Sequence, residues 1–176
     1  LHVAHAWRNA RELSEIESET NVVWESTSPR IFVDASALPV SADSTAASVQ
    51  RAMQAWSESA CSSFRWASNY DRESADVTVM FHRDGWREMG FPRDSLAVTT
   101  TNYEGDERAQ FRIVSASIDV DAENHRWAPV VATEGQRRID AVLAHELGHA
   151  AGFLHPCGDD GLPECTQPTV MDPFYS

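Results

Sequence analysis

The spacing of apolar residues between positions 44 and 61 is typical of an amphipathic helix. Three apolar side chains recur there at intervals of four and three residues, which places them on one helical face. They are Val49, Met53 and Trp56. Ser44 or Thr45 is suited to cap the start of this helix, and the pattern continues to about Cys61. The apolar face predicts that the helix packs on a sheet.

Short runs rich in β-branched and aromatic residues predict several strands. The predicted strands cover residues 30–34, 64–67, 77–82, 96–100 and 113–120. In the last of these, small polar residues alternate with less polar ones, as on a strand that buries one face. The strands follow one another between two helical segments, so we expect a mixed sheet backed by helices.

A second long helix is expected in the last third of the chain. It should begin near residue 133 and run to Gly152, with Leu143 and Leu147 on its buried face. Beyond it the chain is rich in Gly, Pro and Asp, which is typical of irregular structure. The order of strand, helix, several strands, helix and irregular tail predicts an α+β domain.

The length of 176 residues fits one domain, and a core of this size needs no disulfide framework to fold. The chain changes character near residue 28. We therefore expect residues 1–27 to form an N-terminal extension or the remnant of a prosegment, and residues 28–176 to form the main domain. Residues 5–19 predict a weakly amphipathic helix within that first segment.

The net charge of −13 and the pI of about 4.8 make anionic partners unfavourable. Nucleic acids and anionic membrane surfaces are bound by clustered Lys and Arg, so neither is an expected partner. The longest apolar runs are only a few residues long, against roughly 20 for a membrane-spanning helix, so no membrane span is predicted. We expect a monomer.

The motif with the clearest chemistry is His145-Glu146-Leu147-Gly148-His149-Ala150-Ala151-Gly152-Phe153-Leu154-His155, which reads H-E-x-x-H-x-x-G-x-x-H. With this composition, the pattern arises by chance with odds on the order of 10⁻⁴ or less. Residues four apart lie on one face of a helix, so His145 and His149 can bind one zinc ion. Gly152 can adopt positive φ and turn the chain, which allows His155 to become the third ligand.

Three histidine ligands leave one tetrahedral position of the zinc ion for water. Zinc lowers the pKa of bound water from about 15.7 toward about 7, so hydroxide becomes available at neutral pH. Glu146 can accept the proton of that water and pass it to a leaving amine, as a general base. A closed structural zinc site is the alternative, and Cys157 is the only thiol near enough in sequence to complete it.

These residues resemble the metzincin metallopeptidases, and a second motif supports the resemblance. Met171 stands 16 residues after His155, where metzincins have their Met-turn. The resemblance implies that Met171 forms an apolar floor beneath the metal. The pattern of Met171, Pro173 and Tyr175 is most similar to the matrixin branch, which implies that Pro173 and Tyr175 wall the primed-side pocket. Tyr175 is not expected to bind zinc.

The resemblance also implies a metzincin fold, with an N-terminal subdomain (28–152) and a C-terminal subdomain (153–176). Strand 113–120 would form the upper rim of the cleft and pair with an extended polypeptide substrate, unless it is an interior strand. No Cys precedes Cys61, so a matrixin-type cysteine switch is absent from this sequence. The residues considered for a second, structural zinc site are His82, Asp84 and His125.

A disulfide between Cys157 and Cys165, eight positions apart, would close a small loop beside the cleft and stabilise the fold by ~2–3 kcal/mol. Other pairings with Cys61 stay open. Such a bridge, together with the family's habit, predicts a secreted, extracellular or periplasmic protein. A calcium ion is a further candidate cofactor, against the alternative of solvated carboxylates. Its candidate ligands are Asp159, Asp160 and Glu164, or Asp119 and Asp121.

The sequence as a whole therefore predicts an endopeptidase with one catalytic zinc ion, which cleaves extended polypeptides. Two alternatives stay open. One is a catalytically silent zinc domain that binds peptides or a partner protein, and the other is a zinc hydrolase that acts on a non-peptide amide or ester.

Overall fold

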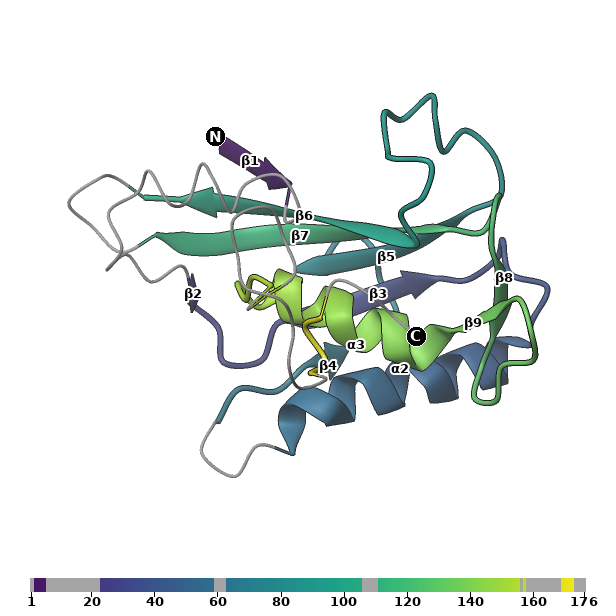
Figure 1. Ribbon diagram of the computed structural model, residues 1–176. Helices are drawn as coiled ribbons and strands as arrows, with labels where there is room; N and C mark the ends of the chain where they lie inside the picture. Colours follow the sequence, from purple (N-terminus) through teal and green to yellow (C-terminus); the bar gives the residue numbers. More distant parts are fainter. Residues whose placement is uncertain are drawn as a thin grey trace.

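The computed structural model describes residues 2–5, 23–58, 63–105, 111–155, 157 and 169–172. Its main sheet is covered on one face by two helices, α2 (Ala42–Ser57) and α3 (Ile139–Ala150) (Figure 1). The core lies between the sheet and these helices, and α2 also packs against α3. This arrangement confirms the predicted α+β fold with a helix-backed sheet.

The main sheet is mixed, with neighbouring strands in the order β1, β6, β7, β5, β3 and β4. These strands are β1 (His2–His5), β3 (Arg30–Asp34), β4 (Ala67–Ser68), β5 (Val77–His82), β6 (Ala97–Glu104) and β7 (Arg112–Asp121), with β2 (Val23–Trp24) paired to β7. Strands β3, β4, β5 and β7 are parallel, whereas β1 and β6 run antiparallel to their neighbours. The predicted bounds of β3 and β5 are confirmed.

The prediction that strand 113–120 is the rim of the cleft is wrong. This strand, β7, lies inside the sheet, because β5 pairs with it on one side and β6 on the other. Ile118 and Val120 are fully buried. Strand β6 is the neighbour of β7 that packs closer to α3. It extends to Glu104, whereas the sequence predicted an end near residue 100. The side of β6 opposite β7 carries β1.

Helix α2 forms because its apolar positions fall on one face. Val49 and Met53 are buried in the core, as predicted. The cap is Ser41, whose Oγ accepts a hydrogen bond from the backbone N–H of Ser44, so the helix begins earlier than predicted. The helix ends at Ser57, and Cys61 lies outside the described residues.

Helix α3 begins at Ile139, six residues later than predicted. The last three residues before it form β9 (Gln136–Arg138), which pairs in parallel with β8 (Arg126–Ala128). Gly135, with a φ of +77°, turns the chain into β9. Almost every residue of α3 is buried between the sheet and α2, so the helix is a rigid platform for its side chains.

The N-terminal segment, residues 1–27, contributes two strands to the sheet, β1 and β2. Residues 2–5 pair antiparallel with residues 100–103 of β6. The helix predicted for residues 5–19 lies outside the described residues, except for His5, which belongs to β1. None of the described helices is long and apolar enough to cross a membrane.

Candidate metal and catalytic centre

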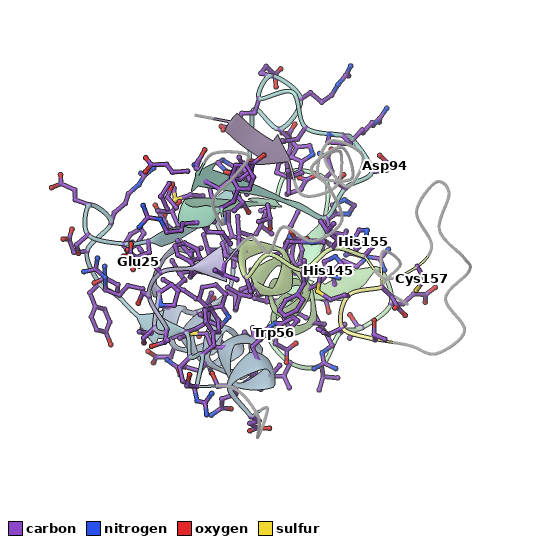
Figure 2. The ribbon with its side chains drawn as sticks, turned by 90° about the vertical axis from the view of Figure 1, so that its left-hand side faces the viewer. Glu25, Trp56, Asp94, His145, His155 and Cys157 are labelled. Carbon is purple, nitrogen blue, oxygen red and sulfur yellow. The ribbon has the colours of Figure 1, made fainter. Side chains whose placement is uncertain are left out.

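The three histidines of the motif meet at one point beside α3. His145 and His149 are buried and lie one helical turn apart, and His155 comes from the segment that follows the helix. The three Nε2 atoms are 2.9 Å (His145 to His149), 3.0 Å (His145 to His155) and 3.0 Å (His149 to His155) apart. Figure 2 shows His145 and His155 side by side. The structure therefore brings all three predicted ligand residues together.

Hydrogen bonds on the far side of two rings set their orientation. Nδ1 of His145 donates to the carbonyl oxygen of Val170 at 2.8 Å, and Nδ1 of His149 donates to that of Phe153 at 2.8 Å. A carbonyl oxygen only accepts, so each Nδ1 carries the proton and each neutral ring turns a lone pair on Nε2 toward the other rings. Such outer contacts are typical of histidines that bind metals.

This donor set fits a zinc ion. Three nitrogens about 2.0–2.1 Å from zinc lie about 3.3 Å apart in a regular tetrahedron, within a few tenths of an ångström of the separations found. Burial, and next the neighbouring His149, lower the pKa of His145 to about 3, so its ring is neutral at pH 7. Neutral imidazole is the form that binds metal. No second cluster of potential metal ligands occurs among the described residues.

The turn after α3 carries His155 back to the site. Gly152 has a φ of +97°, which confirms the predicted helix stop, although the last helical residue is Ala150. The backbone N–H of Gly152 bonds to the carbonyl of His149 at 2.9 Å, and that of Phe153 to Gly148 at 3.0 Å. This pair of bonds is a Schellman motif, which satisfies the last carbonyls of the helix and reverses the chain.

Glu146 lies next to His145 in the sequence, and its side chain is buried. Its Oε2 lies 2.5 Å from Oγ1 of Thr99 on β6, at hydrogen-bonding distance. Burial raises the pKa of Glu146 to about 7, although the Thr99 hydrogen bond opposes this rise. A carboxylate with a pKa near neutral can both take up and release a proton at physiological pH. Sequence reasoning missed Thr99, which stands in a run of three threonines without any motif spacing.

Met171 is buried against the underside of α3. A Cβ placed on Gly148 would lie 2.2 Å from the sulfur of Met171 and 2.5 Å from Cζ2 of Trp56, so glycine is required for this close approach. The turn around Met171 is held by Thr169, whose Oγ1 donates to Asp172 at 2.7 Å and accepts from the Met171 N–H at 3.2 Å. Pro173 and Tyr175 lie outside the described residues.

Trp56 links α2 to this centre, a role beyond the core position that its spacing predicts. Its Nε1 donates to the carbonyl oxygen of Ala144 at 2.6 Å, and its ring stacks on Phe153 with centroids 5.1 Å apart. Figure 2 shows Trp56 on the side of α3 that faces α2. The tryptophan thus contacts both α3 and the segment that leads to His155.

The residues considered for a second zinc site do not gather around one point. Nε2 of His82 lies 2.8 Å from Asp119, and Nε2 of His125 lies 3.8 Å from Asp121. Asp121 also accepts hydrogen bonds from the residues that follow it, including Asn124 at 2.8 Å. Asp119 and Asp121 therefore have protein partners, and the structure gives no support for calcium at either residue.

The remaining candidates fall in the loop between His155 and the Met-turn. Asp159, Asp160, Glu164 and Cys165 lie outside the described residues. The disulfide between Cys157 and Cys165 stays a prediction for this reason.

Comparisons with known proteins agree with this geometry. The family model for matrixin matches residues 23–175, which is most of the chain. The match includes the histidine motif and the Met-turn. A comparison with curated proteins finds no match.

Proposed function

The chain belongs to the matrixin family of metallopeptidases, and on this premise we propose that it is a zinc-dependent endopeptidase. His145, His149 and His155 hold the ion in this proposal. The observation that carries it is the convergence of three Nε2 atoms within 3.0 Å of one another, two of them on rings whose Nδ1 protons are committed to backbone carbonyls.

The chemistry divides between the metal and Glu146. Zinc, when bound, supplies an acidified water molecule and polarises the carbonyl of the peptide bond to be cleaved. Glu146 accepts a proton from the water as the water oxygen adds to the carbonyl carbon. It then returns a proton to the leaving nitrogen as the carbon–nitrogen bond breaks. The pKa of Glu146, raised to about 7 by burial, suits both steps.

The substrate in this proposal is an extended polypeptide that lies along β6 rather than β7. Strand β6 packs next to α3, and its Thr99 reaches Glu146. Within the described chain, β1 pairs with residues 100–103 of β6, and no strand pairs with residues 97–99 on that side. Backbone N–H and C=O groups of such an edge can bind a peptide with little regard to its sequence.

The proposal also covers the residues and segments around the centre. Met171 supports the site from below, and Pro173 and Tyr175 wall the primed-side pocket. Residues 28–176 form the catalytic domain, and residues 1–27 an extension or prosegment remnant. We also propose a bridge between Cys157 and Cys165, a monomer, and, from the bridge together with the family's habit, a secreted, extracellular or periplasmic protein.

The experiment is cleavage of an unfolded protein by the zinc-loaded chain, with and without the chelator phenanthroline. We expect internal cuts that the chelator abolishes. Glu146→Ala should keep zinc and lose nearly all turnover, because it removes the base, whereas Glu134→Ala, an exposed position, should behave as the parent. Activity of Glu146→Ala within about tenfold of the parent would contradict the role of the base.

Zinc content separates the ligand assignment from catalysis. His155→Ala should lose zinc on dialysis, because two histidines hold the ion less tightly than three. Unchanged metal content in this variant would show that His155 is not a ligand. One zinc ion per parent chain without any cleavage would favour the silent binding domain.

A further inference from the structure

One side chain outside the motif reaches the carboxylate of Glu146. Thr99, on β6, places its Oγ1 2.5 Å from Oε2 of Glu146 and 3.3 Å from the backbone carbonyl oxygen of the same residue. Thr99 is fully buried. Within the described part of the chain, no other side chain hydrogen-bonds to this carboxylate. The contact joins the sheet to the active-site helix across 47 positions of sequence.

We propose that Thr99 is the positioning residue for Glu146. Its hydroxyl donates to Oε2 and so fixes the direction in which the other oxygen, Oε1, accepts a proton from water. The inference rests on the proposed function, in which Glu146 is the general base. The side chain of Thr99 is buried and acts through Glu146, whereas the proposed contacts of β6 with substrate are made by its backbone groups.

The need for such a residue follows from the flexibility of glutamate. The last torsion of a Glu side chain has a broad, roughly two-fold preference, so packing alone sets the carboxylate plane weakly. A hydrogen bond to an ionised group is among the strongest available and fixes that plane. Thr99 is a rigid donor, because its β-branched side chain has a restricted first torsion and its backbone pairs with Ile118 in the sheet.

Thr101 provides a matched control on the same strand. It lies two residues further along β6 and therefore on the same face, and it is also buried. Its Oγ1 has no hydrogen-bond partner among the described residues. Replacing either threonine by valine removes one buried hydroxyl from one face of one strand, but only Thr99→Val removes the contact with Glu146.

The test compares Thr99→Val, Thr99→Ser and Thr101→Val with the parent, all loaded with zinc. We expect Thr99→Val to lower kcat by about 10-fold or more, with KM and zinc content unchanged. This loss is a part of the rate enhancement of about 10²–10⁴-fold that general base catalysis contributes. Thr99→Ser keeps the hydroxyl and should recover most of the loss. Thr101→Val keeps the backbone groups of β6 and loses only a hydroxyl without a hydrogen-bond partner among the described residues, so it should match the parent in kcat.

A second measurement does not depend on activity. The buried hydroxyl proton of Thr99, bonded to a carboxylate, should give a slowly exchanging proton NMR signal that is absent in Thr99→Val and moves upfield in Glu146→Ala. A Thr99→Val enzyme within twofold of the parent in kcat, or an equal loss in Thr101→Val, would overturn the inference. If the parent cleaves no better than Glu146→Ala, the proposed function fails, and the NMR signal then decides whether Thr99 holds Glu146.

Discussion

His145 donates its Nδ1 proton to the carbonyl oxygen of Val170 at 2.8 Å, so the Met-turn orients the first histidine of the motif directly. The two residues are 25 positions apart. Met171, the next residue, packs beneath α3. The turn therefore contacts the centre in two ways. The backbone carbonyl of Val170 orients the His145 ring, and the side chain of Met171 packs against α3.

Weakening this turn should weaken zinc binding. In Thr169→Val the turn loses the hydroxyl that bonds to Asp172 at 2.7 Å and to the Met171 N–H at 3.2 Å, so the Val170 carbonyl is held less firmly. Loss of an outer contact of this kind costs about 10–100-fold in metal affinity, and we expect the lower end because Thr169 is exposed. Competition with a zinc-binding dye measures the affinity.

Thr133→Val is the matched control for that variant. Thr133 is also exposed, and its hydroxyl also closes a short turn, by bonding to Gln136 at 2.7 Å. That turn precedes β9 and carries none of the three histidines. Equal zinc affinities in the two variants would show that the Thr169 turn does not orient His145.

Gly148→Ala should destabilise the protein although alanine is the better helix former. Propensity alone predicts a gain of about 0.8–1 kcal/mol. The new Cβ, however, would lie 2.2 Å from the Met171 sulfur and 2.5 Å from the Trp56 ring, so both must move away from α3. Overpacking of this kind costs about 1–3 kcal/mol. Thermal unfolding of the zinc-free protein measures the balance, and a raised Tm would contradict the packing seen here.

Local sequence patterns are sufficient to predict some elements of the fold and of the site. The bounds of β3 and β5 agree with the prediction because each is a short apolar run in the middle of the sheet. The convergence of the three histidines could be predicted from spacing alone, because the helix and the turn at Gly152 are both local structures.

The rest depends on contacts between distant segments. The pairing of β8 with β9, which delays the start of α3, joins two runs of three residues without any alternation. The order of β6 and β7 in the sheet depends on which strand packs closer to α3, and this is a contact between distant segments. Thr99 meets Glu146 only because β6 packs on α3, and nothing in the run of threonines marks the one that makes this contact.

Strand β1 pairs with the edge of β6 along which we propose that substrate binds. Deletion of residues 1–5 should uncover residues 100–103 of β6 and so lower KM for an unfolded protein substrate. In the parent, substrate must first displace β1 from this edge. Each 1.4 kcal/mol of free energy in the pairing of β1 with β6 should therefore correspond to about a tenfold decrease in KM on deletion. The value of kcat should stay the same, because the residues proposed for catalysis lie on α3 and on the segment that follows it, whereas β1 pairs with β6. A KM that rises on deletion would contradict competition between β1 and substrate.

The start of α3 is held by a buried carboxylate between two arginines. Oδ2 of Asp140 lies 2.9 Å from both Arg51 and Arg138. Burial alone would raise the pKa of Asp140, but the hydrogen bonds from Arg138 and Arg51 outweigh it and hold this pKa below its ordinary value. Because the folded pKa is the lower one, the stabilisation is complete above the unfolded pKa of about 3.9 and is lost as the pH falls through the folded value.

Asp140→Asn should therefore lower the free energy of unfolding at pH 7 by about 1–2 kcal/mol, since both guanidinium groups are partly exposed and solvent screens them. The difference from the parent should shrink below about pH 4, where Asp140 of the unfolded parent is protonated. Asp76→Asn, which breaks the more exposed pair with Arg30, should cost only about 0.2–1 kcal/mol. Urea unfolding at pH 7 and pH 3 measures these differences. A cost for Asp140→Asn that is the same at both pH values would show that the charge of Asp140 does not stabilise α3.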